Sequence, residues 1–312
     1  MKKNSGILIG ILVVLVLVLI GELGFLFKDR LATILPAKDP APVTGSTTAP
    51  TTQATTQATT QPTTEATTEP TTEATTEPTA PTTPEERAET TVSAFAAQNG
   101  LSLADYPESL MKLLARNPET EDFVLSYPLE KDMEHTVDLS GTDLSKVPLF
   151  LQWDKRWGYT IYGNDVAGLT ACGPTALSMA AYYLTGGDPK MTPDKIIQFA
   201  LDNGYCAPGN GSYWSLIYQG GEDLGLDVWE IDKGYASVKE ELEGGHVIIC
   251  LVGPGAFTTD GHFIVIAGMD SDGKLIINDS NSRTRSEKTW DYYEIYDQID
   301  TMWTLCGHDY VG

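Results

Sequence analysis

Basic residues are scarce in this chain of 312 residues, in which 20 Lys and Arg stand against 43 Asp and Glu for a formal net charge of −23. Such acidity excludes nucleic-acid binding and repels anionic lipid, although basic peptides are attracted. Cysteine and histidine are also few, with 4 of each. No Cys-x-x-Cys pair and no matching His spacing occurs among them, so we expect no zinc site and no other metal or cofactor.

Charged side chains are nearly absent from residues 6–27, a stretch about as long as the ~20 apolar residues that a helix needs to cross a bilayer. Lys2 and Lys3 precede it and favour a cytoplasmic N-terminus. A cleavable signal peptide is the alternative, but no Ala-x-Ala-like cleavage site follows the apolar core. We therefore predict a cytoplasmic leader at residues 1–5, a single-pass signal anchor in the cell membrane at residues 6–27 and an extracellular remainder.

Bulky apolar residues are absent from residues 47–78, which repeat a Thr-Thr-(Ala/Gln/Glu)-(Ala/Pro) tetrapeptide. Such a segment cannot bury a core and is expected to stay disordered, extended by its Pro and Glu residues. We predict that residues 28–84 form a stalk, and some 40 residues at ~3.1 Å each in polyproline geometry would reach roughly 120 Å. The stalk would hold the following domain away from the membrane.

Helical composition returns after the stalk. We expect residues 85–140 to form a helical prelude that packs against the next domain, and a separate binding module is the alternative. Residues 141–312 suffice for one core and place helices before strands, an order that predicts an α+β fold. The expected prelude helices span 85–98, 103–114 and 119–127; the later helices span 173–184, 193–203, 213–224 and 237–243, and the strands 246–252, 262–268, 274–278, 292–296 and 302–306.

Cys172 stands where a helix is expected to begin. Pro174 suits the first turn, because its missing N–H would have no intrahelical partner there, and apolar residues at helical spacing follow over 176–183. A thiol at a helix N-terminus feels the positive end of the helix dipole, which favours the nucleophilic thiolate. The structural alternative is an inert core residue, the commonest role of a cysteine on an apolar helix. We predict that Cys172 is a catalytic nucleophile.

His262 is the candidate base, because it follows an Asp-Gly turn signal and begins an apolar strand. A short turn at residues 270–273 makes the next strand antiparallel, and this register places His262 roughly opposite Asp279. The Asp279 carboxylate could then orient the imidazole. Asn278 is the rival orienter, but side chains alternate along a strand, so only one of the two reaches His262. Ordinary strand-end and turn-forming roles are the alternatives for His262 and Asp279.

Gln152 is the candidate oxyanion donor. It ends a short apolar run that lies upstream of Cys172. Its side-chain amide, together with N–H groups at the start of the Cys172 helix, could stabilise a tetrahedral oxyanion. The alternative is an ordinary polar surface residue.

The other three cysteines lack the spacing of a metal site. Cys250 and Cys306 lie in apolar runs and are predicted to be buried strand residues. An extracellular location would permit a disulfide among Cys206, Cys250 and Cys306, but their spacing in the sequence does not support one.

Four motifs in order give a family resemblance over residues 147–306: Val147–Gln152, Ala171–Thr175, Gly261–Phe263 and Asn278–Ser280. They resemble the papain-like cysteine peptidases of family thirty-nine, the group that includes the double-glycine leader peptidases. The resemblance implies a papain-like fold, with N-terminal helices packed on an antiparallel sheet. It also implies that the oxyanion glutamine, nucleophile, base and orienting aspartate of the family correspond to Gln152, Cys172, His262 and Asp279.

Two residues depart from the family pattern. Ala171 replaces the glycine that usually precedes the cysteine, and Ser280 replaces the proline that usually follows the aspartate. Neither change removes a catalytic group, but both leave room for altered geometry.

The function expected from these features is that of a surface-anchored, monomeric, extracellular cysteine peptidase that acts on a peptide or protein. Two alternatives remain. One is an amidase or endopeptidase of peptidoglycan stem peptides, which suits the expected location, although the chain has no recognisable cell-wall-binding repeat. The other is a catalytically silent domain that only binds a peptide.

Overall fold

The structure, a computed structural model, describes residues 83–209 and 211–308. The predicted leader and signal anchor, and nearly all of the predicted stalk, lie outside the described residues. Among the helices of the described part, none has the length and apolar character needed to cross a membrane.

The prelude is helical, and its elements are α2 (Pro84–Asn99), η1 (Leu103–Asp105), α3 (Glu108–Arg116), η2 (Pro118–Thr120) and α4 (Glu121–Glu130). Thr83 begins α2 through a capping box, because its hydroxyl accepts a hydrogen bond from the Glu86 N–H while the Glu86 carboxylate accepts one from the Thr83 N–H. The second predicted helix, 103–114, is instead two elements. Pro107 separates them, because a residue before proline, here Tyr106, is extended.

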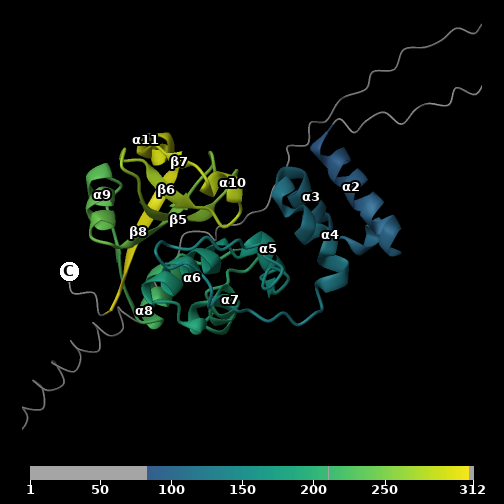
Figure 1. Cartoon of the computed structure of the whole chain (residues 1–312), viewed down its shortest axis with the longest axis horizontal. Coiled ribbons are helices and arrows are strands. Elements are labelled where there is room, and N and C mark those ends of the chain that lie inside the picture. The colour runs from purple at the N-terminus through teal and green to yellow at the C-terminus, as the bar shows by residue number, and fades with distance from the viewer. Residues whose placement is uncertain (1–82, 210, 309–312) are drawn as a thin grey trace, which may run out of the picture. The chain divides into compact units, whose positions relative to one another are not determined.

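The prelude helices α2, α3 and α4 lie together (Figure 1), and their buried side chains share one hydrophobic cluster with the domain that follows. Phe123 of α4 stacks on Tyr159 with 4.6 Å between ring centroids, and the Tyr159 hydroxyl donates to the Phe123 carbonyl at 2.8 Å. A Cβ on Gly168 would lie 2.5 Å from the Phe123 ring, so the ring needs a glycine there. These contacts fix the prelude against the start of the next domain.

Residues 141–308 form an α+β unit, as predicted from the order of helices and strands. Its helices are α5 (Ala167–Thr170), α6 (Cys172–Leu184), η3 (Pro189–Met191), α7 (Pro193–Asp202), α8 (Ser215–Asp223), α9 (Tyr235–Glu243), α10 (Arg283–Ser286), α11 (Tyr292–Ile295) and η4 (Tyr296–Gln298). Its strands are β1 (Ile161–Tyr162), β2 (Asp165–Val166), β3 (Leu226–Glu230), β4 (Val247–Val252), β5 (His262–Met269), β6 (Leu275–Asn278), β7 (Thr289–Trp290) and β8 (Ile299–Gly307). β1 and β2 form a small hairpin, and the main sheet is antiparallel in the order β3-β8-β4-β5-β6-β7.

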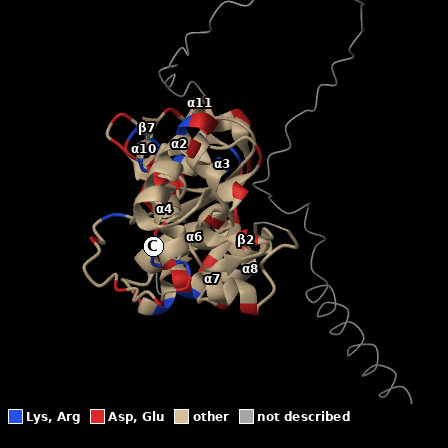
Figure 2. Cartoon of the chain, turned by 90° about the vertical axis from the view of Figure 1, so that its right-hand side faces the viewer, with Lys and Arg blue, Asp and Glu red and all other residues tan. Residues whose placement is uncertain are grey.

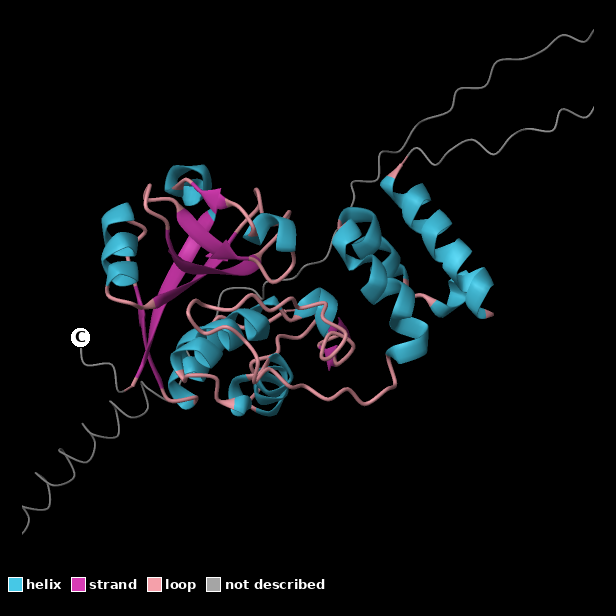
Figure 3. Cartoon of the chain, in the orientation of Figure 1, coloured by secondary structure: helices cyan, strands magenta, loops and turns pink. Residues whose placement is uncertain are grey.

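The main sheet is covered on both faces (Figure 3). Every residue of β4 is buried, and its residues alternate between two cores. Ile249 and its neighbours on one face pack with α6, whereas Ile248 and Cys250 on the other pack with Val238 of α9. Burial on both faces explains why this strand is an unbroken apolar run.

The strand predicted at 292–296 was wrong, because α11 and η4 occupy these residues. The Asp291 carboxylate accepts a hydrogen bond from the Tyr293 N–H and caps a helical turn. Tyr292 and Ile295, three residues apart, both face the second core, which is helical spacing. The edge strand β3 was not predicted, although Gly225 with φ 84° turns the chain into it.

Candidate active site

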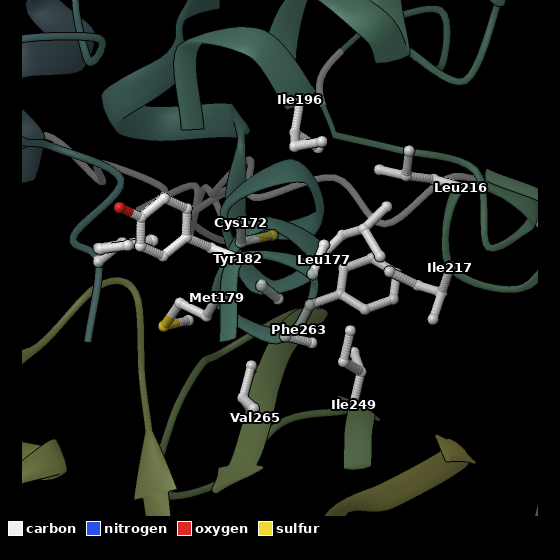
Figure 4. Close-up of a cluster of buried hydrophobic side chains, with 14 of the residues drawn as sticks. Cys172, Leu177, Met179, Tyr182, Ile196, Leu216, Ile217, Ile249, Phe263 and Val265 are labelled. Carbon is white, nitrogen blue, oxygen red and sulfur yellow. The ribbon is translucent and has the colours of Figure 1, made fainter. Parts of the chain in front are cut away.

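Cys172 is the first residue of α6, the place predicted from the sequence. Its side chain belongs to the buried cluster that joins α6 to β5, and Figure 4 draws it in the same cluster as Leu177 and Phe263. A Cβ on Gly173 would lie 2.8 Å from the Ser212 hydroxyl, so the residue after the cysteine must be small. The first turn of α6 is thus closely packed against Ser212. The Cys172 N–H lies at a position that has no intrahelical acceptor.

His262 begins β5 and links Cys172 to Asp279. Its Nε2 lies 2.8 Å from Asp279 Oδ1, and the Cys172 thiol is near enough for the thiol and the imidazole to shift each other's pKa. With Nε2 engaged by the carboxylate, Nδ1 is the ring nitrogen left to exchange a proton with the thiol. The three side chains are buried, so their mutual charges act with little solvent screening.

The electrostatics of this trio favour a thiolate–imidazolium pair. Burial lowers the pKa of His262, but the charge and hydrogen bond of Asp279, with those of Cys172, outweigh it and raise that pKa to about 10. Burial raises the pKa of the Cys172 thiol, but the hydrogen bond and charge of His262 and backbone N–H groups lower it overall. Burial likewise raises the pKa of Asp279, and the cations His262 and Arg285 bring it below its ordinary value.

The hairpin of β5 and β6 explains how Asp279 reaches His262. The strands are antiparallel as predicted, with Val265 opposite Asn278 and a register shift between Ile266 and Gly268. Extending that register by one residue places Asp279 across from Ile264, two residues along β5 from His262. The pair, expected to lie roughly opposite each other, is therefore diagonal, and diagonal neighbours on one face remain within reach.

Asn278 points elsewhere, as side-chain alternation predicts. Its Nδ2 donates to the carbonyls of Val147 and Pro148, at 3.0 Å in each case. The hydrogen bond to His262 is made by Asp279. The predicted choice between the two residues is confirmed as geometry, and their effect on catalysis stays a prediction.

Gln152 is buried beside the trio and held on both ends of its amide. Its Nε2 donates to the Gly168 carbonyl at 3.0 Å, and its Oε1 accepts from the Ser280 hydroxyl at 2.9 Å. The Gln152 backbone N–H also donates to the Ser280 carbonyl at 2.8 Å. An amide nitrogen carries two hydrogens, so Gly168 leaves one for another acceptor.

Two residues that the sequence reasoning missed hold Asp279 in place. Arg285 Nε donates to Asp279 Oδ2 at 2.5 Å, and the Ser286 hydroxyl accepts from the Asp279 N–H at 2.9 Å. Both lie in the short helix α10. Two basic residues within Arg283–Ser286 of an acidic chain were the available signal, but no motif connects them to the aspartate.

A cavity of about 490 Å³ opens onto this site. Its walls include Cys172, His262, Gln152 and Arg285, so the candidate nucleophile, base and amide line one space. Part of the remaining wall comes from the prelude. In the part of the chain that the structure describes, no group of three His, Cys, Asp or Glu side chains is placed to hold a metal ion.

The remaining cysteines are free thiols. Cys250 in β4 and Cys306 in β8 are buried, which confirms their prediction as buried strand residues. Burial raises the pKa of Cys206, Cys250 and Cys306. Cys172 is thus the one cysteine whose surroundings favour the thiolate.

Comparison with known proteins places the chain in a family. No curated protein matches its sequence. One solved structure that it resembles is the peptidase domain of Streptococcus ComA, a bi-functional ABC transporter involved in a quorum-sensing pathway, with 16% identity over 52% of this chain and 98% of that domain, and a TM-score of 0.33. The sequence model of the Peptidase_C39 like family matches residues 144–309, more than half of the chain. The chain therefore belongs to the Peptidase_C39 like family.

Proposed function

We propose that this protein is a cysteine peptidase with Cys172 as nucleophile, His262 as general base and acid, and Asp279 as the residue that orients His262. One observation carries the proposal: the buried His262 ring is hydrogen-bonded to the Asp279 carboxylate and lines the same cavity as the Cys172 thiol, whose pKa it lowers. A cavity large enough for a peptide segment opens onto the same thiol.

Acylation would begin from the thiolate–imidazolium pair. Cys172 Sγ attacks the scissile carbonyl carbon, and the carbonyl oxygen becomes an oxyanion. The Cys172 N–H and the second hydrogen of Gln152 Nε2 are the donors available to that oxyanion. His262 Nδ1 then gives its proton to the leaving amine as the C–N bond breaks, and an acyl-enzyme remains.

Deacylation would use the same groups in reverse order. His262, now neutral, takes a proton from a water molecule that attacks the thioester carbonyl. The tetrahedral intermediate collapses, Cys172 leaves as thiolate, and the carboxylic acid product is released. Asp279 keeps its negative charge throughout and stabilises the imidazolium each time it forms.

The substrate we propose is an extracellular peptide or protein. Acidic positions are spread over the described elements (Figure 2) and exceed basic ones in the whole chain, which favours basic peptide segments. The placement outside the cell rests on residues 6–27 as a signal anchor and residues 28–84 as a stalk, and both stay proposals.

Peptide hydrolysis by the full chain tests the function. Wild type and Cys172→Ala are incubated in parallel with a mixed peptide library and with purified muropeptides, and products are read by mass spectrometry. Cleavage of library peptides by wild type alone supports the peptidase. Cleavage of muropeptide stem peptides alone would identify a cell-wall hydrolase, and equal inertness of both proteins would indicate a binding domain.

A further inference from the structure

Residues 281–286, which follow Asp279 in the sequence, form hydrogen bonds with its carboxylate and its backbone N–H. Asn281 N–H donates to Asp279 Oδ1 at 2.8 Å, the oxygen that also contacts His262, while Arg285 bonds the other oxygen. Ser286 receives the Asp279 N–H. The orientation of the carboxylate therefore depends on where residues 281–286 lie.

That segment is in turn held by the prelude. The Glu119 carboxylate in η2 accepts hydrogen bonds from the Ser282 hydroxyl at 2.6 Å and from the Arg283 N–H at 2.8 Å. It also accepts longer bonds from the Thr284 N–H at 3.3 and 3.4 Å. Asn117 adds a further hydrogen bond, because its Nδ2 donates to the Asn281 carbonyl at 2.7 Å.

Glu119 accepts these hydrogen bonds from residues 282–284 as an ionised carboxylate. Burial raises its pKa, but the hydrogen bonds from Ser282, Arg283 and Thr284 outweigh burial and hold the pKa below the ordinary value. Hydrogen bonds to an ionised acceptor are stronger than those between neutral groups. These hydrogen bonds between Glu119 and residues 282–284, which we call the clamp, thus involve a charged acceptor near neutral pH.

We infer that Glu119 is a positioning residue for the active site: by holding residues 281–286, it fixes Asp279 against His262. The inference rests on the proposed function, since it gives the prelude a part in the proposed triad. Glu119 lies outside residues 144–309, the span that the family model matches. The active unit of this chain therefore begins in the prelude.

Loss of the clamp has a defined electrostatic consequence. When residues 281–286 are less ordered, Asp279 stabilises the His262 imidazolium less, so the pKa of His262 falls. Because the imidazolium is then less populated, it stabilises the Cys172 thiolate less, and the pKa of the thiol rises. The pH at which Cys172 becomes reactive reports this change, whereas a loss of global stability alone does not move it.

The experiment measures the rate of iodoacetamide alkylation of Cys172 against pH in the full chain. We expect Glu119→Ala to raise the midpoint of this profile by about one pH unit and Glu119→Gln, which keeps one acceptor oxygen, to raise it less. Asn117→Ala loosens the same segment by removing the bond to the Asn281 carbonyl and the cap on the Glu119 N–H. Glu108→Ala is the matched control, because Glu108 is a prelude glutamate paired with Lys112 on α3 instead.

Thermal unfolding of each variant establishes that the profile belongs to folded protein. A Glu119→Gln or Asn117→Ala profile that superimposes on that of wild type, in folded protein, would overturn the positioning role. An equal shift in Glu108→Ala would also overturn it. A wild-type Cys172 that reacts only at the pH of an ordinary thiol would instead contradict the proposed function, so the two failures are distinguishable.

Discussion

The Ser280 hydroxyl donates a 2.9 Å hydrogen bond to the side-chain oxygen of Gln152. Ser280 occupies the place where the family pattern has a proline, and a proline there could neither donate nor accept through its side chain. The bond fixes which end of the Gln152 amide faces the Gly168 carbonyl. A departure from the family pattern thus orients the proposed oxyanion donor.

Ser280→Ala is expected to lower kcat about tenfold with little change in KM. The substitution frees the Gln152 amide to rotate, and removing an oxyanion donor outright typically costs 10²- to 10³-fold. Steady-state kinetics on a peptide that the wild type cleaves measure kcat and KM separately. Ser178→Ala is the control, because Ser178 is also buried and donates one bond, to the Met191 carbonyl, away from the site. Equal effects in both variants would point to general destabilisation.

Asp279→Ala is expected to slow acylation by a few orders of magnitude, because the imidazole loses its orienting partner. Asn278→Ala should change the rate far less, since Asn278 bonds the Val147 and Pro148 carbonyls. Single-turnover acylation of the two variants provides the comparison. A larger loss in Asn278→Ala, with both proteins folded, would exclude the Cys-His-Asp arrangement.

Phe123→Ala is expected to destabilise the protein by about 3–5 kcal/mol, the usual range for a buried aromatic. The ring stacks on Tyr159 and fills the space over Gly168, so its loss opens a cavity between the prelude and the rest of the fold. Urea unfolding measures the change. Leu129→Ala, at a side chain that is 48% exposed, should cost far less, and an equal cost would show that Phe123 does not bridge the two parts.

Proteolytic shaving of intact cells is expected to release the domain. The proposed topology places residues 31–312 outside the cell, and we expect cutting within the proposed stalk, at its threonine-rich stretch 47–78. Immunoblotting of the supernatant follows the released fragment. Protection in intact cells, with cutting only after lysis, would show the reverse orientation.

Local patterns were sufficient to predict the positions of Cys172 and His262, because each begins a regular element. The α+β class followed from the same periodicities. The contacts that join distant segments were not predictable: the Ser280–Gln152 bond spans 128 residues and the Ser282–Glu119 bond spans 163. Such contacts depend on tertiary packing, which no local period encodes.

Two errors have similarly physical origins. The aromatic residues at 292–296 favour a strand by propensity, but the Asp291 cap and burial of Ile295 against the second core select a helical turn. Continued without the register shift between Ile266 and Gly268, the pairing of Met269 with Leu275 would place Asp279 opposite Val265, on the other face from His262; the shift moves Asp279 opposite Ile264 and makes the contact with His262 a diagonal one. A β-bulge of this kind leaves little trace in a sequence.

The most direct test of the account is the site of alkylation in the full chain at limiting iodoacetamide and pH about 6, well below the ordinary pKa of a thiol. We expect one dominant adduct, at Cys172, because His262 lowers the pKa of that thiol while burial raises the pKa of the other three. Peptide mapping by mass spectrometry locates it, and Cys172→Ala should remain unlabelled. A dominant adduct at Cys206, Cys250 or Cys306 would contradict the assignment of Cys172 as the nucleophile.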